Sequence, residues 1–280
     1  MNPTKRLVLR AGPIRIGLEV EHAPFAAIII ERYGRYLTRR PPGVTITIQP
    51  HRGFQPGYAP DIRHETIDGG CAVMSSSMAF TYHPARRQGL LQLAPDRDQA
   101  VDSIENALRV AVQRLAIERG CLLVHAGAAA RVTRGVLFPA GEGGGKSTLA
   151  GLCRAAGCSI LGDDLVMAAR GRGRTVFLYG VPFRGETTVR RFRIGPVRLA
   201  RLVFIAHGRG RTLTPLDRSE AAGRLAAHVP FITGAPRPVL AGVLETVRRM
   251  TAFHPVTFAY DLGSRPEGVV GRMLGRKDPA

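Results

Sequence analysis

The sequence contains no tryptophan, few aromatic residues and almost no lysine. Aromatic side chains make up 6% of the chain, and of its 40 Lys and Arg residues only three are lysines: Lys5, Lys146 and Lys277. Proteins that bind single-stranded nucleic acid interleave basic side chains with aromatic ones on which bases stack, and this chain lacks that pattern. Because arginine replaces lysine almost everywhere, a position that keeps lysine indicates a need for a compact ammonium group.

Cysteine is scarce and long apolar runs are absent. The four cysteines form no C-x-x-C pair and have no histidine at zinc-site spacing, so we expect Cys153 and Cys158 to be small buried residues. No apolar run approaches the ~18 residues of a membrane span. Residues 1–20 lack the apolar stretch and cleavage site of a secretory signal. We therefore expect a cytoplasmic chain without a membrane span.

Acidic residues are outnumbered: 21 Asp and Glu against 40 Lys and Arg give a net charge of +19. The arginines are spread along the chain, with pairs such as Arg39-Arg40, Arg86-Arg87 and Arg248-Arg249. They either form solvated faces of an arginine-rich protein or dock an acidic peptide or small protein. Nucleic acid is a further candidate, which a steep loss of affinity with salt would reveal.

The length of 280 residues and 45% hydrophobic content allow one large or two small domains. Residues 1–95 predict a β-rich N-terminal region of unknown role. Its strand-like segments are 26–30, 44–48 and 71–74, and segments 78–83 and 90–93 are expected to pair. A helix over 96–119 is expected to connect this region to a second domain within 96–280.

A glycine-rich loop gives the strongest functional signal. The apolar run 136–138 precedes the glycines of 141–145, and Lys146-Ser147-Thr148 then opens a helix. This order is typical of a P-loop, whose backbone N–H groups and helix N-terminus hold phosphate. The alternative is a glycine-rich turn that binds nothing. The predicted nucleotide-binding residues are Gly141, Glu142, Gly143, Gly144, Gly145, Lys146, Ser147 and Thr148.

Two features flank this loop. Strands at 122–131 and 136–139, joined by a turn at 133–135, enter it as a hairpin. After the helix, the short strand 158–161 ends in Gly162-Asp163-Asp164. A carboxylate at the end of a strand beside a P-loop binds Mg²⁺, and a second one can accept a proton from an attacking hydroxyl. The alternative is a turn in which the aspartates cap the next element.

The rest of the sequence indicates further helices and strands and one more candidate site residue. Glu186 lies in a polar loop and either serves a metal or pairs with Arg184 in solvent. Asp217 and Glu220 have capping-box spacing before a helix that ends near residue 228. Further predictions are a strand over 197–206, a helix over 239–250, a strand over 256–260 and then a polar tail.

His125-Ala126-Gly127, the hairpin into the P-loop and Gly162-Asp163-Asp164 together carry a resemblance to a known family. The chain resembles the HPr kinase/phosphorylase family, in particular stand-alone serine kinases such as those of lasso-peptide biosynthesis. The resemblance covers about residues 120–190. It implies an α/β fold of the α+β type with a mixed sheet and a phosphoenolpyruvate-carboxykinase-like P-loop core. Ala140 and Glu142 stand where the family has Gly and Ser, which points away from HPr itself as substrate.

The resemblance also implies roles. ATP and Mg²⁺ would be the cofactors, and the chain would transfer a phosphoryl group to a serine of a peptide or small acidic protein. A small-molecule alcohol as acceptor and a silent ATP-binding regulatory module are the alternatives, and a homo-oligomer stays open. The implied catalytic residues are Asp163 as base, His125 and Lys146, with His125 alternatively structural. The implied metal residues are Ser147, Asp164 and Glu186.

Overall fold

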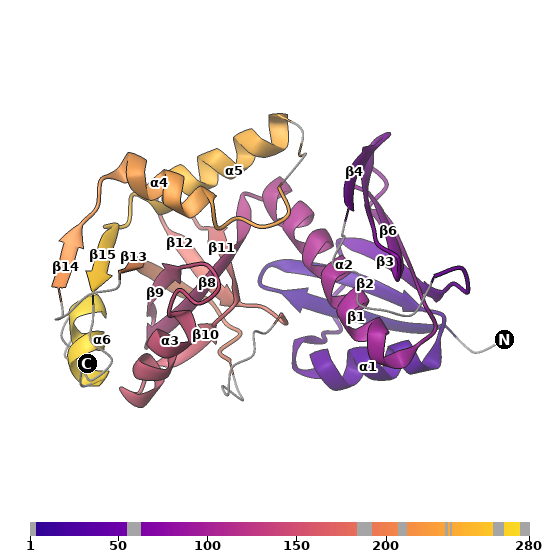
Figure 1. The fold of residues 1–280 in the computed structure, drawn as a ribbon, viewed down its shortest axis with the longest axis horizontal. Helices are drawn as coiled ribbons and strands as arrows, with labels where there is room; N and C mark the ends of the chain where they lie inside the picture. Colours follow the sequence, from indigo (N-terminus) through magenta and orange to yellow (C-terminus); the bar gives the residue numbers. More distant parts are fainter. Residues whose placement is uncertain are drawn as a thin grey trace. The chain divides into compact units, whose positions relative to one another are not determined.

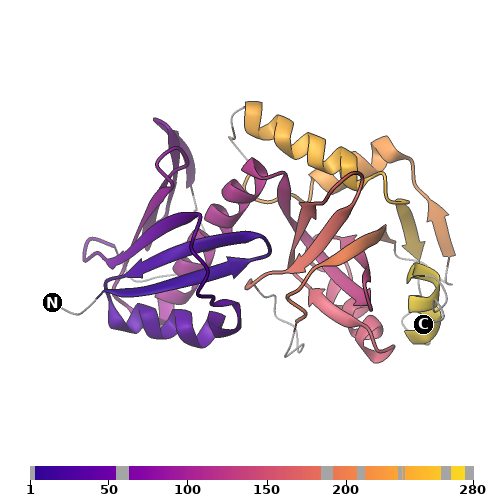
Figure 2. The ribbon, with the colours of Figure 1, turned by 180° about the vertical axis from the view of Figure 1, so that it is seen from behind.

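The computed structural model describes residues 4–54, 63–183, 192–206, 212–232, 235, 237–259 and 266–274. The chain has a mixed α/β fold with two mixed β-sheets. It divides into two compact units, Met1–Leu115 with Phe231–Pro236, and Ala116–Pro230 with Arg237–Ala280. The division falls inside helix α2 (Arg97–Glu118), which covers the segment predicted as a connecting helix. Figures 1 and 2 show both units from opposite sides.

The first unit contains a seven-stranded sheet in the order β1-β2-β3-β7-β6-β5-β4. Strands β2, β3 and β7 are parallel to one another, and the other pairs are antiparallel. The bounds are β1 (Lys5–Ala11), β2 (Ile14–Val20), β3 (Val44–Pro50), β4 (Arg63–Ile67), β5 (Gly70–Met74), β6 (Met78–His83) and β7 (Gln88–Leu93). The predicted strands at 44–48 and 71–74 and the predicted hairpin are confirmed.

The predicted strand at 26–30 is wrong, because this segment lies within helix α1 (Ala23–Tyr33), which precedes the short helix η1 (Gly34–Tyr36). A short apolar run has no period that separates a strand from a helix. Pro24 in the first turn favours the helix. The buried positions then follow helical spacing: Phe25, Ala26, Ile28, Ile29 and Tyr33.

A buried carboxylate joins α1 to α2. Glu105 is 5% exposed, and it accepts hydrogen bonds from Arg32 Nε at 2.8 Å and the Tyr33 hydroxyl at 3.2 Å. Arg109, one turn further along α2, also pairs with it. Buried charges are tolerated when they are paired in this way. Burial and the nearby Glu105 together raise the pKa of Tyr33.

The second unit contains an eight-stranded sheet in the order β10-β8-β11-β12-β13-β15-β14, with β9 paired to both β8 and β13. Strand β9 is antiparallel to β8 and parallel to β13. The bounds are β8 (Cys121–Arg131), β9 (Arg134–Pro139), β10 (Ser159–Gly162), β11 (Leu165–Arg170), β12 (Val176–Gly180), β13 (Val197–Ala206), β14 (Thr212–Pro215) and β15 (Val256–Ala259). The predicted hairpin into the glycine loop is confirmed, with its turn at Val132 and Thr133.

Besides the end of α2, the described residues of this unit form the helices α3 (Lys146–Ala155), α4 (Arg218–Ala226), α5 (Arg237–Met250) and α6 (Pro266–Leu274). Figures 1 and 2 show α4 and α5 on the side of the sheet opposite α3 and α6. The polar tail predicted after the last strand is wrong where α6 lies. Val269, Val270, Met273 and Leu274 form its apolar stripe and share a buried cluster with Leu149 and Cys153 of α3.

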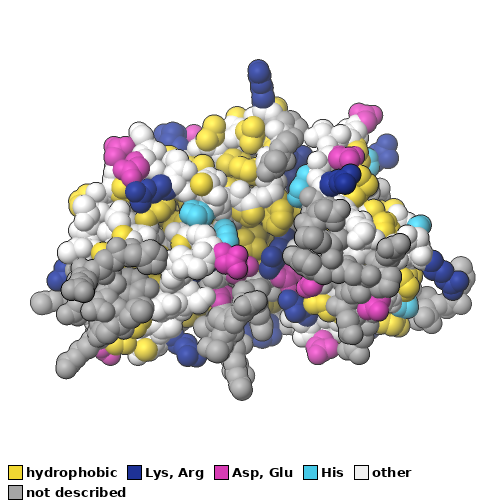
Figure 3. Space-filling view, viewed as in Figure 1, with side chains coloured by type: hydrophobic (Ala, Val, Ile, Leu, Met, Phe, Trp, Pro, Cys, Tyr) yellow, Lys and Arg dark blue, Asp and Glu magenta, His cyan; other side chains and the backbone are white. Residues whose placement is uncertain are grey.

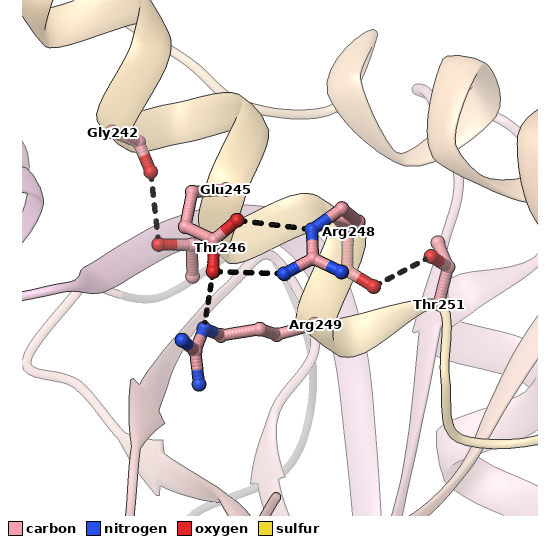
Figure 4. A network of polar contacts seen from close by, with 6 residues as sticks. All are labelled: Gly242, Glu245, Thr246, Arg248, Arg249 and Thr251. Atoms are coloured by element: carbon pink, nitrogen blue, oxygen red, sulfur yellow. Dashed lines mark hydrogen bonds and ion pairs between the residues drawn. The ribbon is translucent and has the colours of Figure 1, made fainter.

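Helix α5 has a buried stripe and a polar face; Figure 4 shows the polar contacts. Val243, Val247 and Met250 are buried, which confirms the predicted amphipathic helix. On the polar face, Glu245 accepts hydrogen bonds from Arg248 Nε at 3.0 Å and Arg249 Nε at 2.7 Å. These hydrogen bonds lower the pKa of Glu245 to about 2.

Charged side chains are scattered on the face seen in Figure 3, where Lys and Arg mix with acidic, histidine and apolar side chains. The net positive charge is therefore not collected in one patch on that face. Within the described part of the chain, none of the helices combines the length and apolar character needed to cross a membrane.

The cysteines are free thiols, as expected for Cys153 and Cys158. Cys121, Cys153 and Cys158 are buried and Cys71 is half-buried. At the end of α3, the Cys158 N–H donates to the Cys153 carbonyl at 2.9 Å and the Gly157 N–H to the Arg154 carbonyl at 2.9 Å. With Gly157 at φ +79°, these bonds form the Schellman motif that ends the helix.

Candidate functional site

The glycine loop leaves β9 at Pro139 and ends where α3 begins at Lys146. Gly143 and Gly145 have φ angles of +68° and +85°, a backbone region that favours glycine. A Cβ on Gly144 would lie 2.8 Å from the Cβ of Ala140. Ala140 therefore fits at the start of the loop because position 144 carries no side chain.

Lys146 is buried at the base of the loop, with 7% of its surface exposed. Its Nζ donates to the carbonyl oxygens of Ala140 at 2.8 Å and Gly141 at 2.7 Å. Burial lowers the pKa of Lys146, and the nearby carboxylates of Asp164, Asp163 and Glu142 act to raise it. The loop thus holds an ammonium group close to three carboxylates.

The aspartate pair interrupts what would otherwise be one continuous strand. Both β10 and β11 run antiparallel to β8, β10 beside residues 128–130 and β11 beside residues 121–125. A Cβ on Gly162 would lie 2.5 Å from the carbonyl oxygen of Leu165, so this tight break requires glycine. The Ala126 N–H donates to the Asp164 carbonyl at 2.9 Å. Ala126 also pairs with Pro139, which brings the break beside the start of the glycine loop.

His125 links β8 to this break. Its Nε2 lies 3.0 Å from Oδ1 of Asp164, and the two side chains are 34% and 23% exposed. Asp163 is 3% exposed. The carboxylate that pairs with the histidine is therefore also the more accessible of the two.

A second histidine, His228, was not found by the sequence reasoning. The His125 N–H donates to the His228 carbonyl at 2.8 Å, and the two rings meet edge to face with centroids 6.5 Å apart. Burial lowers the pKa of His228, and the charges of His125 and Lys146 lower it further. His228 follows helix α4, and no motif in the sequence marks it.

Of the predicted capping box, the N-cap at Asp217, which positions the start of α4, is confirmed. The Asp217 carboxylate accepts from the backbone N–H groups of Ser219 at 2.7 Å and Glu220 at 3.2 Å. The cap fixes where the helix starts, and buried Leu225 and Val229 anchor its far end. These contacts hold the segment that carries His228 beside β8.

Most of the predicted site residues lie around one point. His125 contacts Asp164, and Asp163 and Asp164 lie close enough to Lys146 to act on its pKa. Gly144 and Gly145 are half-buried in the loop. Exposed positions of the loop and of the first turn of α3 are Gly141, Glu142, Gly143, Ser147 and Thr148. Arg184 and Glu186 lie outside the described residues.

The described residues contain no group of three or more His, Cys, Asp or Glu side chains arranged to hold a metal. Mg²⁺ in nucleotide sites typically takes one or two protein ligands and completes its shell with phosphate oxygens and water. The Ser147 hydroxyl at the helix start and a carboxylate of the aspartate pair are oxygen donors of that kind. The residues present therefore fit a Mg²⁺ ion that arrives with phosphate.

Comparison of the chain with protein-family models and with curated proteins finds no match.

Proposed function

We propose that this chain is an ATP- and Mg²⁺-dependent kinase that transfers a γ-phosphoryl group to a hydroxyl, with a serine of a peptide or small protein as acceptor. The proposal includes a P-loop core of the phosphoenolpyruvate-carboxykinase-like type, as in HPr kinase/phosphorylase. One observation carries it. The buried Lys146 of a glycine loop lies among the carboxylates of an aspartate pair, one of which is bound by His125.

Phosphate binding is supported by the loop and by the helix that follows it. Gly143 and Gly145 take the positive φ angles that let a glycine loop turn into a helix, and the N-terminus of α3 adds partial positive charge. Lys146 supplies a full charge, already held by two carbonyls of the same loop. A triphosphate matches this combination because its charge is spread over several oxygens.

Ser147 and one carboxylate of the pair would hold Mg²⁺, and Glu186, proposed as a third metal residue, is not among the described residues. The bound ion would supply positive charge that offsets the charge of the phosphates. The chain's own part is to keep oxygen donors beside the phosphate loop.

The roles within the aspartate pair follow from exposure and from the histidine contact. Sequence reasoning favoured Asp163 as base and Asp164 as metal residue. The 3.0 Å contact with His125 and the greater exposure of Asp164 support the reverse assignment, with Asp164 as base. A carboxylate oxygen of Asp164 would accept the proton of the attacking hydroxyl. The hydroxyl oxygen would bond to the γ-phosphorus while the bond from that phosphorus to the β,γ-bridging oxygen breaks, and ADP would leave. His125 would orient this carboxylate.

The testing experiment measures phosphoryl transfer from ATP to serine-containing peptides by mass spectrometry, with nucleotide binding measured in parallel. Asp164→Asn should still bind ATP but lose transfer by about 10²- to 10⁴-fold, the usual contribution of a general base. Lys146→Ala should lose nucleotide binding or turnover. If Asp163→Asn shows the larger loss of transfer, the roles within the pair are those first predicted.

Two other outcomes would replace the proposal. Phosphorylation of small alcohols but of no peptide would identify a small-molecule kinase. Binding of ATP and Mg²⁺ without transfer to any hydroxyl would identify a regulatory module. Full transfer activity in Lys146→Ala would contradict the P-loop role itself.

A further inference from the structure

Three loops of the first unit meet at one end of its sheet. The parallel strands β2, β3 and β7 start there, as their registers show: Ile16 pairs with Val44, and Thr45 pairs with Gln88. The segments that lead into these strands are the β1–β2 turn, the segment before β3 and the β6–β7 turn. They therefore lie side by side although they are far apart in the sequence.

Each of these three segments carries two arginines. Five of the six side chains are exposed and Arg15 is half-buried. The segments 10–15, 38–43 and 84–88 contain no Asp or Glu. We call this set the arginine rim; it consists of Arg10, Arg15, Arg39, Arg40, Arg86 and Arg87.

Backbone and side-chain contacts tie the rim together. Arg15 Nε donates to the Pro41 carbonyl at 2.7 Å, and the Gly43 N–H donates to the Arg15 carbonyl at 2.9 Å. The Thr45 N–H then donates to the Arg87 carbonyl at 3.0 Å. The rim is thus a fixed arrangement of neighbouring loops.

The rim concentrates positive charge without internal compensation. Arg10 and Arg15 are direct cross-strand partners, an arrangement that like charges make unfavourable. Further along the same hairpin, Arg6 pairs with Glu19 at 3.2 Å. Among the described residues, none of the six rim arginines forms an ion pair with a carboxylate. The nearest acidic turn at this end of the sheet holds Asp68, between β4 and β5.

Arg87 adds an unfavourable backbone conformation. Its N–H donates to the Pro84 carbonyl at 3.1 Å, which closes the β6–β7 turn, and its φ of +52° lies in the region that favours glycine. An arginine at this position costs conformational free energy that a glycine would not. The Arg87 side chain therefore adds a positive charge to the rim at a position where the backbone conformation favours glycine.

We propose that the arginine rim binds an acidic polypeptide segment. Guanidinium groups bind carboxylates through paired hydrogen bonds, and neighbouring strands lie about 4.8 Å apart, so the three loops match carboxylates on an extended segment of a few residues. The rim segments contain no aromatic residue on which a base would stack. The large exposed apolar side chains of the described residues lie elsewhere: Ile30, Val132, Leu240 and Leu244.

If the proposed kinase function holds, the acidic segment belongs to the phosphoryl acceptor; this link alone rests on that function. Binding to the rim needs neither ATP nor turnover. A chain that binds acidic peptide without transferring phosphate would support the rim and contradict the kinase. A chain that transfers phosphate but does not bind acidic peptide would support the kinase and contradict the rim.

The test titrates fluorescently labelled poly-L-glutamate with the full chain at moderate salt. Arg39→Gln with Arg40→Gln should weaken binding by about tenfold, because two charge-assisted contacts are lost. The matched control is Arg172→Gln with Arg174→Gln, which removes the same charge from the exposed β11–β12 turn of the second unit. We expect the control to weaken binding by less than about twofold. Equal losses in both variants would overturn the proposal, since binding would then follow net charge alone.

Two further measurements separate the proposal from an effect on folding and from nucleic-acid binding. Arg87→Gly relieves the left-handed backbone, so it should leave the melting temperature unchanged or higher while still weakening poly-L-glutamate binding. If Arg87→Gly lowers both the melting temperature and the binding of poly-L-glutamate, the expected relief of backbone strain is contradicted. Poly(U) serves as the second probe. If the rim variants weaken poly(U) binding more than poly-L-glutamate binding, the rim is a nucleic-acid site and the acidic-polypeptide proposal is wrong.

Discussion

Burial and neighbouring charge act in opposite directions on Lys146 and in the same direction on His228. For Lys146, burial lowers the pKa and three carboxylates act to raise it. For His228, burial and the neighbouring His125 and Lys146 all lower the pKa. Burial therefore disfavours the charged form of both side chains, and nearby carboxylates oppose this effect only at Lys146.

The lowered pKa of His228 predicts a pH dependence of stability. An unfolded histidine has a pKa of about 6.5. Between that value and the lower folded pKa, the unfolded chain binds more protons than the folded chain. The contribution of His228 to stability is therefore fully present above about pH 6.5 and is lost as the pH falls towards the folded pKa. His228→Gln should reduce the loss seen in urea unfolding between about pH 7 and pH 5. His51→Gln, at an exposed position, is the control. If the unfolding free energy of His228→Gln depends on pH as it does in the unchanged chain, the prediction is contradicted.

At the scale of elements, the paired strands β8 and β9 include a close contact between a glycine and an aromatic ring. Gly127 and Phe138 are cross-strand partners, and Phe138 is fully buried. A Cβ on Gly127 would lie 2.0 Å from Cε2 of Phe138. The glycine two residues after His125 thus serves packing, and it lets the ring lie flat against the strand that leads to the glycine loop.

We expect Gly127→Ala to destabilise the chain by about 1–3 kcal/mol, the usual cost of overpacking a core. Gly151→Ala is the control because a Cβ there meets nothing within 4 Å. This second change removes a glycine from the interior of α3 and should stabilise by about 0.5–1 kcal/mol. Denaturant unfolding of both variants checks the pair. Combining Gly127→Ala with Phe138→Leu should recover part of the loss; purely additive effects would show that the ring is not the cause.

The sequence predicted those elements whose signals are local. The alternation in β3, the 3–4 spacing in α5 and the cap of α4 are set by neighbouring residues, and all three are found. Helix α1 was mistaken for a strand because a short apolar run has no distinguishing period. Helix α6 was missed because its four apolar residues become informative only when α3 is beside them. His228 reaches the site through the path of the chain after α4, which no local pattern encodes.

At the scale of the whole molecule, the described site residues all belong to the second unit. Ligands that bind only the folded state stabilise it by mass action. ATP with Mg²⁺ should therefore slow hydrogen exchange in the glycine loop and at the Gly162–Asp164 break, and should leave β1 to β7 unchanged. At about 100 times the dissociation constant the stabilisation is about 2.7 kcal/mol. Chelation of Mg²⁺ and Lys146→Ala should each remove most of it; equal protection of the first unit would contradict this localisation.

The rate at which the buried thiols react can report local unfolding of the chain. Burial is the main cause that raises the pKa of each of the four cysteines, that of Cys121 to about 11. Because the thiolate is the reactive form, a thiol reagent at neutral pH should modify the folded chain slowly. Cys71 lies in the first unit and Cys121, Cys153 and Cys158 lie in the second. Because Cys71 is half-buried, only the labelling rate of the three buried cysteines would report how often the second unit opens.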